Sequence, residues 1–151
     1  MFNGTIRKLE EKDVPQVEAI FDLYWSGGFR THLTERLHDQ DINWVVAEEK
    51  GELVGVAALR EAPERMRTFA KTDRVAEFYV AAAKHKGRGI GSALRNVRIE
   101  QAREQGYTEA VFFSGNTHSD SWKFHDDSEF KRVGNATAPS GENGKIWLMA
   151  L

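Results

Sequence analysis

Residues 84–94, KHKGRGIGSAL, hold three glycines at alternate positions, and three basic side chains precede the second glycine. The six residues concerned are Gly87, Gly89, Gly91, Lys84, Lys86 and Arg88. A strand pattern covers 74–83 before them, and an apolar helical pattern begins at Ile90. Backbone N–H groups at such a junction, together with the helix dipole, favour an anion such as a phosphate. The sequence therefore predicts an anion site here; the alternative is a plain turn with solvated basic residues.

Two common nucleotide-binding motifs do not fit this turn. A dinucleotide-binding loop needs GxGxxG, and here Ser92 takes the place of the third glycine. A Walker A loop needs GxxxxGK[ST], which does not occur in the chain. Neither motif supports a nucleotide at this position.

The composition indicates one globular domain, residues 1–151, with a net charge of −2. That charge argues against a general binder of nucleic acid. Cysteine is absent, which excludes disulfides, thiolate metal sites and cysteine nucleophiles. The polar beginning of the chain does not resemble a signal peptide, and no apolar run approaches the ~18 residues of a membrane span. We therefore expect a cytoplasmic protein that does not bind membranes.

Hydrophobic periodicity predicts the elements that must hold the turn in place. A helix is expected from an N-cap at Asp13 to about Trp25, a second one over 31–38, one from Ile90 to a C-cap at Gly106, and a short one over 118–127. The expected strands are 5–9, 43–49, 52–62, 74–83, 108–114, 129–134 and 145–151. A glycine-rich connection, 135–144, joins the last two strands. The order β–α–α–β–β–β–α–β–α–β–β indicates a mixed α/β domain.

Residues 78–94, FYVAAAKHKGRGIGSAL, resemble the acetyl-CoA-binding segment of the GNAT superfamily of acyl-CoA N-acyltransferases. That segment is a strand followed by [Gln/Arg]-x-x-Gly-x-[Gly/Ala] and a long helix, and here Lys86 replaces Gln or Arg. Residues 122–134, WKFHDDSEFKRVG, resemble the family's FYxxxGFxxxG segment, with Phe124 and His125 in the places of Phe and Tyr. Asn116 stands where members often have an Asn near the pantetheine arm. The order of elements is also that of the family.

The resemblance implies a GNAT-like fold, with a central, mostly antiparallel sheet of about seven strands, splayed in the middle and flanked by about four helices. It implies acetyl-CoA as cofactor, with its pyrophosphate on the N–H groups of 87–92 and its pantetheine arm beside 80–82. The N–H of Val80 is the implied donor to the thioester carbonyl. The cofactor-binding residues implied are Val80, Ala81, Ala82, Lys86, Gly87, Arg88, Gly89, Ile90, Gly91, Ser92, Asn116 and Phe124.

The reaction implied is transfer of the acetyl group to a primary amine of a small molecule, an amino acid or a protein N-terminus, by direct attack in a ternary complex. An alkylammonium of pKa ~10 must first lose a proton. Glu77 shares one strand face with Tyr79 and is the candidate base; the alternative is an ordinary solvated carboxylate. His125 stands where many members have a tyrosine near the thioester sulfur. Its imidazole can act as acid or base, or His125 is a surface or packing residue.

Candidate acceptor-binding residues are Trp25, Phe29, Arg30 and Tyr79. Arg30 is able to hold a carboxylate; in the alternative, Trp25 and Phe29 pack in the core and Arg30 is solvated. His118 and His125 are seven residues apart without a third ligand, so no metal is expected. The apolar segment 145–151 pairs either within the sheet or across a homodimer.

Two other functions remain open on the sequence. The first is a non-catalytic acyl-CoA-binding or sensor module on the same fold, because fold alone does not establish activity and His125 replaces the usual tyrosine. The second is a nucleotide- or nucleic-acid-binding protein that uses the basic turn, which the acidic net charge disfavours.

Overall fold

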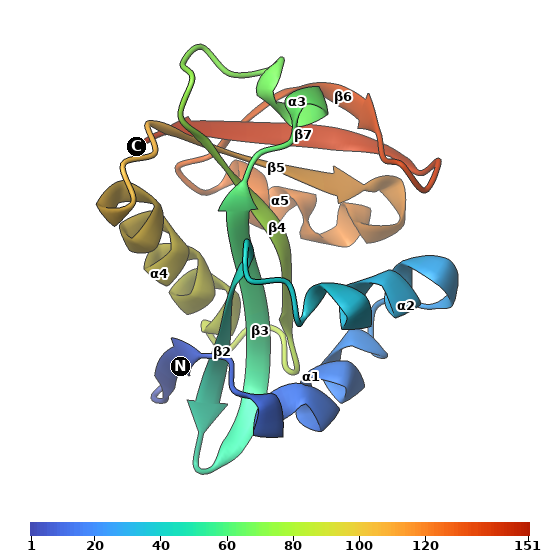
Figure 1. Ribbon diagram of the computed structural model, residues 1–151, viewed down its shortest axis with the longest axis vertical. Helices are drawn as coiled ribbons and strands as arrows, with labels where there is room; N and C mark the ends of the chain where they lie inside the picture. Colours follow the sequence, from blue (N-terminus) through green and yellow to red (C-terminus); the bar gives the residue numbers. More distant parts are fainter. The chain divides into compact units, whose positions relative to one another are not determined.

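The computed structural model describes residues 1–151 as a mixed α/β fold, which confirms the predicted class (Figure 1). The strands are β1 (Thr5–Lys8), β2 (Asn43–Glu49), β3 (Glu52–Glu61), β4 (Val75–Ala83), β5 (Glu109–Gly115), β6 (Lys131–Thr137) and β7 (Asn143–Ala150). The helices are α1 (Val14–Phe21), α2 (Gly27–Arg36), α3 (Glu64–Arg67), α4 (Ile90–Glu104) and α5 (Trp122–Asp126), with 3-10 turns η1 (Glu11–Asp13) and η2 (Asn116–Ser121). The seven strands follow the order β1-β2-β3-β4-β5-β7-β6.

The chain forms two compact units. The first consists of Met1–Arg60 and Val80–Gln101, and the second of Glu61–Tyr79 and Ala102–Leu151. Strand β4 and helix α4 each contribute residues to both units. That the whole chain acts as one domain stays a prediction. None of the helices has the length and apolarity needed to cross a membrane.

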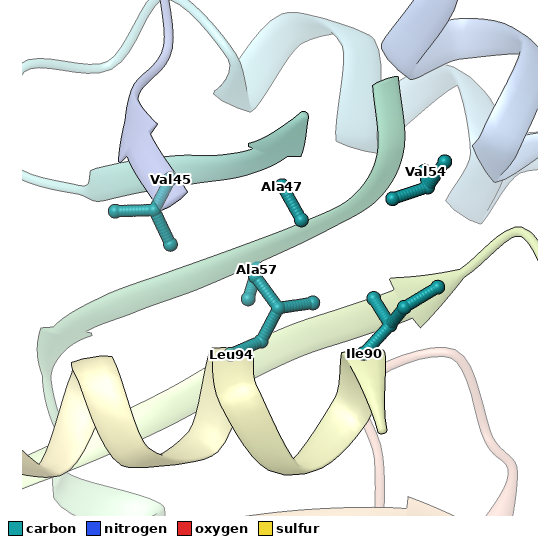
Figure 2. Close-up of a cluster of buried hydrophobic side chains, with 6 residues drawn as sticks. All are labelled: Val45, Ala47, Val54, Ala57, Ile90 and Leu94. Carbon is teal, nitrogen blue, oxygen red and sulfur yellow. The ribbon is translucent and has the colours of Figure 1, made fainter. Parts of the chain in front are cut away.

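In the first unit, β1, β2 and β3 are antiparallel, and a tight turn at Lys50 and Gly51 joins β2 to β3. The last part of β4 lies beside β3, since the N–H of Lys84 donates to the carbonyl of Val54 at 2.8 Å. Side chains of β2 and β3 meet the first two turns of α4 in a buried cluster (Figure 2). Val54 and Ala57 of β3 are three residues apart, because the pairing with β2 shifts register between them. Its members are Val45, Ala47, Val54, Ala57, Ile90 and Leu94.

In the second unit, β5 pairs in parallel with β4 and antiparallel with β7, and β7 pairs in turn with β6. Both edges of the apolar segment 145–151 are therefore paired within the chain along most of its length. The register of β6 slips between Arg132 and Gly134, so Val133 lies in a β-bulge and is 44% exposed.

Several element boundaries differ from the predictions. Helix α2 begins at Gly27, four residues earlier than expected. The connection before β7 is only 138–142, because β6 and β7 extend into the predicted loop. A short helix, α3, lies within a charged stretch and buries Met66 beside Val75 and Val111. Gly106 follows α4 with φ +85°, and the Tyr107 N–H donates to the Ala102 carbonyl, as expected of a helix C-cap.

Asp13 does not cap α1 as predicted. Its carboxylate accepts two hydrogen bonds from the Arg7 guanidinium, at 2.7 and 2.9 Å, and one from the N–H of Glu10 at 2.8 Å. Arg7 also donates to Glu48, so a buried carboxylate ties β1, β2 and the start of α1 together. The hydrogen bonds from Arg7, with support from Glu10, hold the pKa of Asp13 below its usual value although burial opposes this.

We predict that Asp13→Asn lowers the free energy of unfolding by about 2 kcal/mol at neutral pH, since a charged hydrogen-bond pair is lost. The folded-state pKa of Asp13 lies below the unfolded value of about 3.9. The stability that Asp13 contributes is therefore present above about pH 4 and is lost as the pH falls through the folded-state pKa. Urea unfolding from pH 7 to pH 3 should show the difference between wild type and variant shrinking in acid.

Asp127→Asn is the matched control, because Asp127 pairs with Lys123 on an exposed helix face. It should change stability little at any pH. A difference between wild type and Asp13→Asn that grows on acidification would contradict the assignment.

Candidate active site

The predicted anion turn is built by two residues with positive φ between β4 and α4. Gly87 has φ +76° and Gly89 has φ +80°, a backbone conformation that side chains with a Cβ rarely adopt. The N–H of Ala93 donates to the carbonyl of Gly89 at 3.0 Å and closes the first turn of α4. The N–H groups of Ile90, Gly91 and Ser92 therefore have no acceptor within the helix. This donor set fits a pyrophosphate, which is the group that the sequence predicts here.

The basic side chains of the turn are engaged with the first unit. Lys84 forms an ion pair with Glu52, and Arg88 Nη2 lies 3.2 Å from Glu49 Oε1. The Lys86 Nζ lies 6.0 Å from the ring centroid of Tyr24. Because two of the three positive charges are already paired with carboxylates, the backbone N–H groups are the main anion donors of the turn.

A glycine in β3, which the sequence reasoning did not single out, allows α4 to begin where it does. A Cβ on Gly55 would lie 2.7 Å from Ile90 Cγ2 and 3.0 Å from Leu94 Cδ1. Ile90 and Leu94 point from α4 toward the strands (Figure 2) and are 1% and 0% exposed. The end of the turn is thus fixed by close packing against a strand that carries no side chain at this point.

Next to the turn, β4 presents Val80, Ala81 and Ala82, of which Ala81 is exposed and the other two are buried. The hydroxyl of Tyr24 donates to the carbonyl of Ala83 at 2.5 Å. The predicted cofactor residues of 80–92 thus follow one another on β4, the turn and the first turn of α4, all in the first unit.

In the second unit, the parallel pairing of β4 with β5 ends early. It joins Val75, Ala76 and Glu77 to Glu109, Ala110 and Val111, and does not continue to Phe78 and Tyr79 although both strands run on. The strands therefore part at Glu77, the splay that the sequence comparison implied. Glu77 itself is only 4% exposed, so it is not the solvated carboxylate of the alternative interpretation.

His125 lies half-buried against an aromatic cluster. Its ring centroid is 4.6 Å from that of Phe112 and 5.1 Å from that of Trp147, in edge-on contacts, and Phe112 stacks on Trp147 at 5.2 Å. The His125 Nε2 lies 3.4 Å from Ser121 Oγ. Phe124 is 43% exposed beside it, with ring centroids 5.7 Å apart. Asn116 is exposed at the start of η2.

Comparison with known proteins identifies the family. The family model of the acetyltransferase (GNAT) family matches residues 12–130. This chain belongs to the GNAT acetyltransferase family. The turn and α4 lie inside the matched range, and the family resemblance inferred from the sequence is confirmed. Acetyl-CoA, the expected cofactor, is the acetyl donor that this family uses.

Individual GNAT relatives are distant in sequence. The rat (Rattus norvegicus) protein N-acetyltransferase family 8 member 2 is 29% identical over 92 residues, 59% of this chain and 38% of its own length. This chain therefore spans well under half of that relative. PaiA N-acetyltransferase from Thermoplasma acidophilum, solved with coenzyme A, has a TM-score of 0.70 at 15% identity and covers 99% of this chain and 100% of its own. The Salmonella typhimurium protein yncA, solved with its cofactor acetyl-CoA, has a TM-score of 0.74 at 17% identity, with 99% and 94% covered. The GNAT fold is thereby confirmed.

The candidate acceptor residues of this GNAT chain fall into both units. Trp25 packs against Phe21 and Phe29, with ring centroids 5.8 and 6.0 Å apart. Tyr79 is half-buried on β4, in the second unit with Glu77 and His125. No group of three or more His, Asp or Glu side chains is placed to hold a metal ion.

Arg30 joins α1 to α2. It donates to Asp22 at 2.6 Å, to Thr34 at 2.5 Å and to the carbonyl of Glu18 at 3.2 Å. A substrate carboxylate would have to replace one of these partners.

One basic residue of α4, Arg98, is buried. The Arg98 guanidinium donates to the carbonyls of Leu94 and Ala58 at 3.2 and 3.4 Å, and Arg98 is 5% exposed. Burial, with the positive charge of Arg95, lowers the pKa of Arg98 to about 9, so the side chain remains charged at neutral pH. Its aliphatic stem and its hydrogen bonds both attach α4 to the first unit.

We predict that Gly55→Ala lowers the free energy of unfolding by about 1–3 kcal/mol, because the new methyl group would overpack the start of α4. Gly28→Ala is the control: Gly28 lies in α2 with negative φ and nothing within 4 Å of an added Cβ, so this change should be neutral or slightly stabilising. Urea unfolding measures both. Equal stability of Gly55→Ala and wild type would contradict the close approach of Ile90 to β3.

Proposed function

We propose that this protein is an acetyl-CoA-dependent N-acetyltransferase that acetylates a primary amine. The observation that carries the proposal is the glycine turn at the start of α4, with its donor N–H groups, in a chain of the GNAT family. When bound, acetyl-CoA supplies an acetyl group activated as a thioester.

Backbone groups of the first unit are the proposed cofactor site. The N–H groups of 87–92 hold the pyrophosphate, and the backbone of 80–82 holds the pantetheine arm in the manner of an added strand. The parting of β4 from β5 after Glu77 supports this arrangement, because it ends the pairing of β4 before Val80 is reached. Val80 N–H is the proposed donor to the carbonyl oxygen of the acetyl group.

Glu77 and His125 are the proposed proton carriers. Glu77 is buried at the point where β4 parts from β5, which supports a role beside the bound thioester rather than in solvation. It takes a proton from the acceptor ammonium, directly or through water. The aromatic contacts of His125 orient its ring. From one ring nitrogen, His125 would give a proton to the thiolate that leaves when the C–N bond to the amine forms and the C–S bond breaks. Trp25, Phe29, Arg30 and Tyr79 stay candidates for contact with the acceptor.

Ligand binding to the turn can be tested by thermal unfolding. Acetyl-CoA and CoA at about 100 times their dissociation constants should each stabilise the protein by about 2.7 kcal/mol, whereas ATP and NAD should not. Gly87→Ala should remove this stabilisation, because alanine at φ +76° distorts the donor turn.

Gly51→Ala is a closely matched control for that experiment. Gly51 has φ +78°, and like Gly87 it has nothing within 4 Å of an added Cβ, but it lies in the β2–β3 turn. Both variants should lose similar stability without ligand, and only Gly51→Ala should retain the response to CoA. An equal response to ATP, or none to CoA, would mean that the turn is a generic phosphate turn.

Catalysis is tested by release of free CoA thiol when amines are added. We expect His125→Phe to lower kcat by about 10²–10⁴, with little change in the KM for acetyl-CoA, since phenylalanine preserves the ring contacts and removes the proton carrier. His125→Tyr should retain more activity, because tyrosine supplies a hydroxyl. His38→Ala, at an exposed histidine, should leave kcat unchanged.

An unchanged kcat in His125→Phe would remove His125 from the mechanism. Binding of CoA by wild type without thiol release for any amine would instead favour the non-catalytic acyl-CoA-binding module.

A further inference from the structure

A polar groove of about 370 Å³ lies on the β6–β7 hairpin of the second unit. We call it the donor groove and define it by five polar residues: Asn116, Asn135, Thr137, Asn143 and Lys145. Ala136 and Gly144 complete its lining. The mechanism proposed above does not use its hairpin residues.

The register of the hairpin brings the polar side chains together. Asn135 is opposite Lys145, and Thr137 is opposite Asn143. Residues two apart on a strand share a face, so these four side chains lie on one face of the hairpin. Asn116 follows directly after β5, whose Gly115 is paired with Gly144.

Two hydrogen bonds within the groove engage the carboxamide oxygens of Asn135 and Asn143. Lys145 Nζ donates to Asn135 Oδ1 at 2.6 Å, and the Thr137 hydroxyl donates to Asn143 Oδ1 at 2.7 Å. A lysine ammonium can only donate, so the carboxamide atom that faces it is the oxygen. The NH₂ groups of Asn135 and Asn143 then remain available, together with the remaining N–H bonds of Lys145. The groove thus presents a cluster of donors.

The charge of the groove points the same way. Lys145 has no carboxylate within ion-pair distance, whereas Lys84, Lys123 and Arg132 each pair with one. The nearest acidic side chain along the hairpin, Glu142, has its Oε2 engaged by the N–H and hydroxyl of Thr117. Lys145 is the one charged residue in the lining of the groove, and it has no ion-pair partner.

A chain of side-chain contacts links Lys145 to the aromatic cluster around His125. Lys145 Nζ lies 5.9 Å from the ring centroid of Trp122, and Trp122 contacts Trp147 with ring centroids 6.0 Å apart. Trp147 in turn contacts the His125 ring. A small molecule held by the groove would lie along the same face of the second unit as the proposed proton carrier.

We propose that the donor groove binds a carboxylate, so that the acceptor of this enzyme is an amine that also carries a carboxylate, as an amino acid does. An ammonium and two carboxamide NH₂ groups complement the two oxygens of a carboxylate. The identification of this carboxylate ligand as the acceptor rests on the proposed function.

Binding is tested on the full ¹⁵N-labelled chain by NMR, with alanine, phenylalanine and lysine as probes. Ethylamine, phenethylamine and cadaverine are the matched amines without the carboxylate. The amino acids should shift the side-chain NH₂ signals of Asn135 and Asn143, and the amines should not. Lys145→Met should weaken the binding about tenfold, the loss expected when a charged hydrogen bond is removed. Asn143→Ala should weaken it less, because the charge remains.

Lys131→Met is the control, since Lys131 is an exposed lysine on the same hairpin outside the groove. It should bind the amino acids as wild type does. In turnover, the preference of wild type for phenylalanine over phenethylamine, as a ratio of kcat/KM, should fall about tenfold in Lys145→Met and not in Lys131→Met.

The outcomes separate the two proposals. Acetylation of amines with no preference for a carboxylate, unchanged in Lys145→Met, would overturn the inference and leave the proposed function standing. If no amine is acetylated but amino acids still shift the groove signals in a Lys145-dependent manner, the proposed function fails and the carboxylate site stands. Absence of any shift with the amino acids would overturn the site.

Discussion

The first turn of α4 is held by apolar packing rather than by polar contacts. Ile90 and Leu94 are buried against β2 and β3, and the absence of a side chain at Gly55 lets the helix lie close to the strand. A helix fixed at its first residue has a defined set of orphan N–H groups, and those groups are the chemistry of the turn. An anion site made from backbone needs this rigidity, because its donors cannot adjust by changing rotamers. Lys84 and Arg88 are each paired with a carboxylate, so their charges are balanced whether or not a ligand is present. This agrees with an anion site whose donors are backbone N–H groups.

The second unit handles polar groups differently. His125, Trp122 and Trp147 form one aromatic cluster, and Arg132 lies over both tryptophan rings while it pairs with Asp126. The Trp147 indole N–H donates to the same aspartate, and this bond, with the pairing to Arg132, lowers the pKa of Asp126. Side chains in this region are oriented by rings and by one charged network. Such an arrangement can aim an imidazole, whereas a backbone turn can only present N–H groups.

Most of the fold could be predicted because its signals are local. A run of four consecutive apolar residues, 44–47, defines β2, and the Lys50–Gly51 pair forms its hairpin turn. The boundaries that were missed depend on partners far away in the chain. The Asp13 carboxylate binds Arg7 of β1 instead of capping α1. The glycine start of α2 is accompanied by hydrogen bonds from Arg30 to α1 and to Asp22. At the ends of β6 and β7 that meet in the hairpin, the residues are polar and do not alternate with apolar ones, so the sequence pattern does not predict strands there.

For the site, the turn itself was predictable because glycine spacing and helix onset lie within a few residues. The role of Gly55 and the burial of Arg98 could not be predicted, because each depends on a contact with an element distant in sequence. Gly55 of β3 faces α4, and Arg98 of α4 binds a carbonyl of β3.

The bulge at Val133 has a consequence for how this protein behaves when many copies are present. Strand β6 ends the strand order, and a regular edge strand offers unpaired N–H and carbonyl groups to any other chain. The slipped register around Val133 interrupts that row of groups, and the exposed Lys131 adds a positive charge beside it. Pairing of β6 with an edge strand of another copy is therefore disfavoured. The hairpin can expose a polar surface without becoming a template for aggregation.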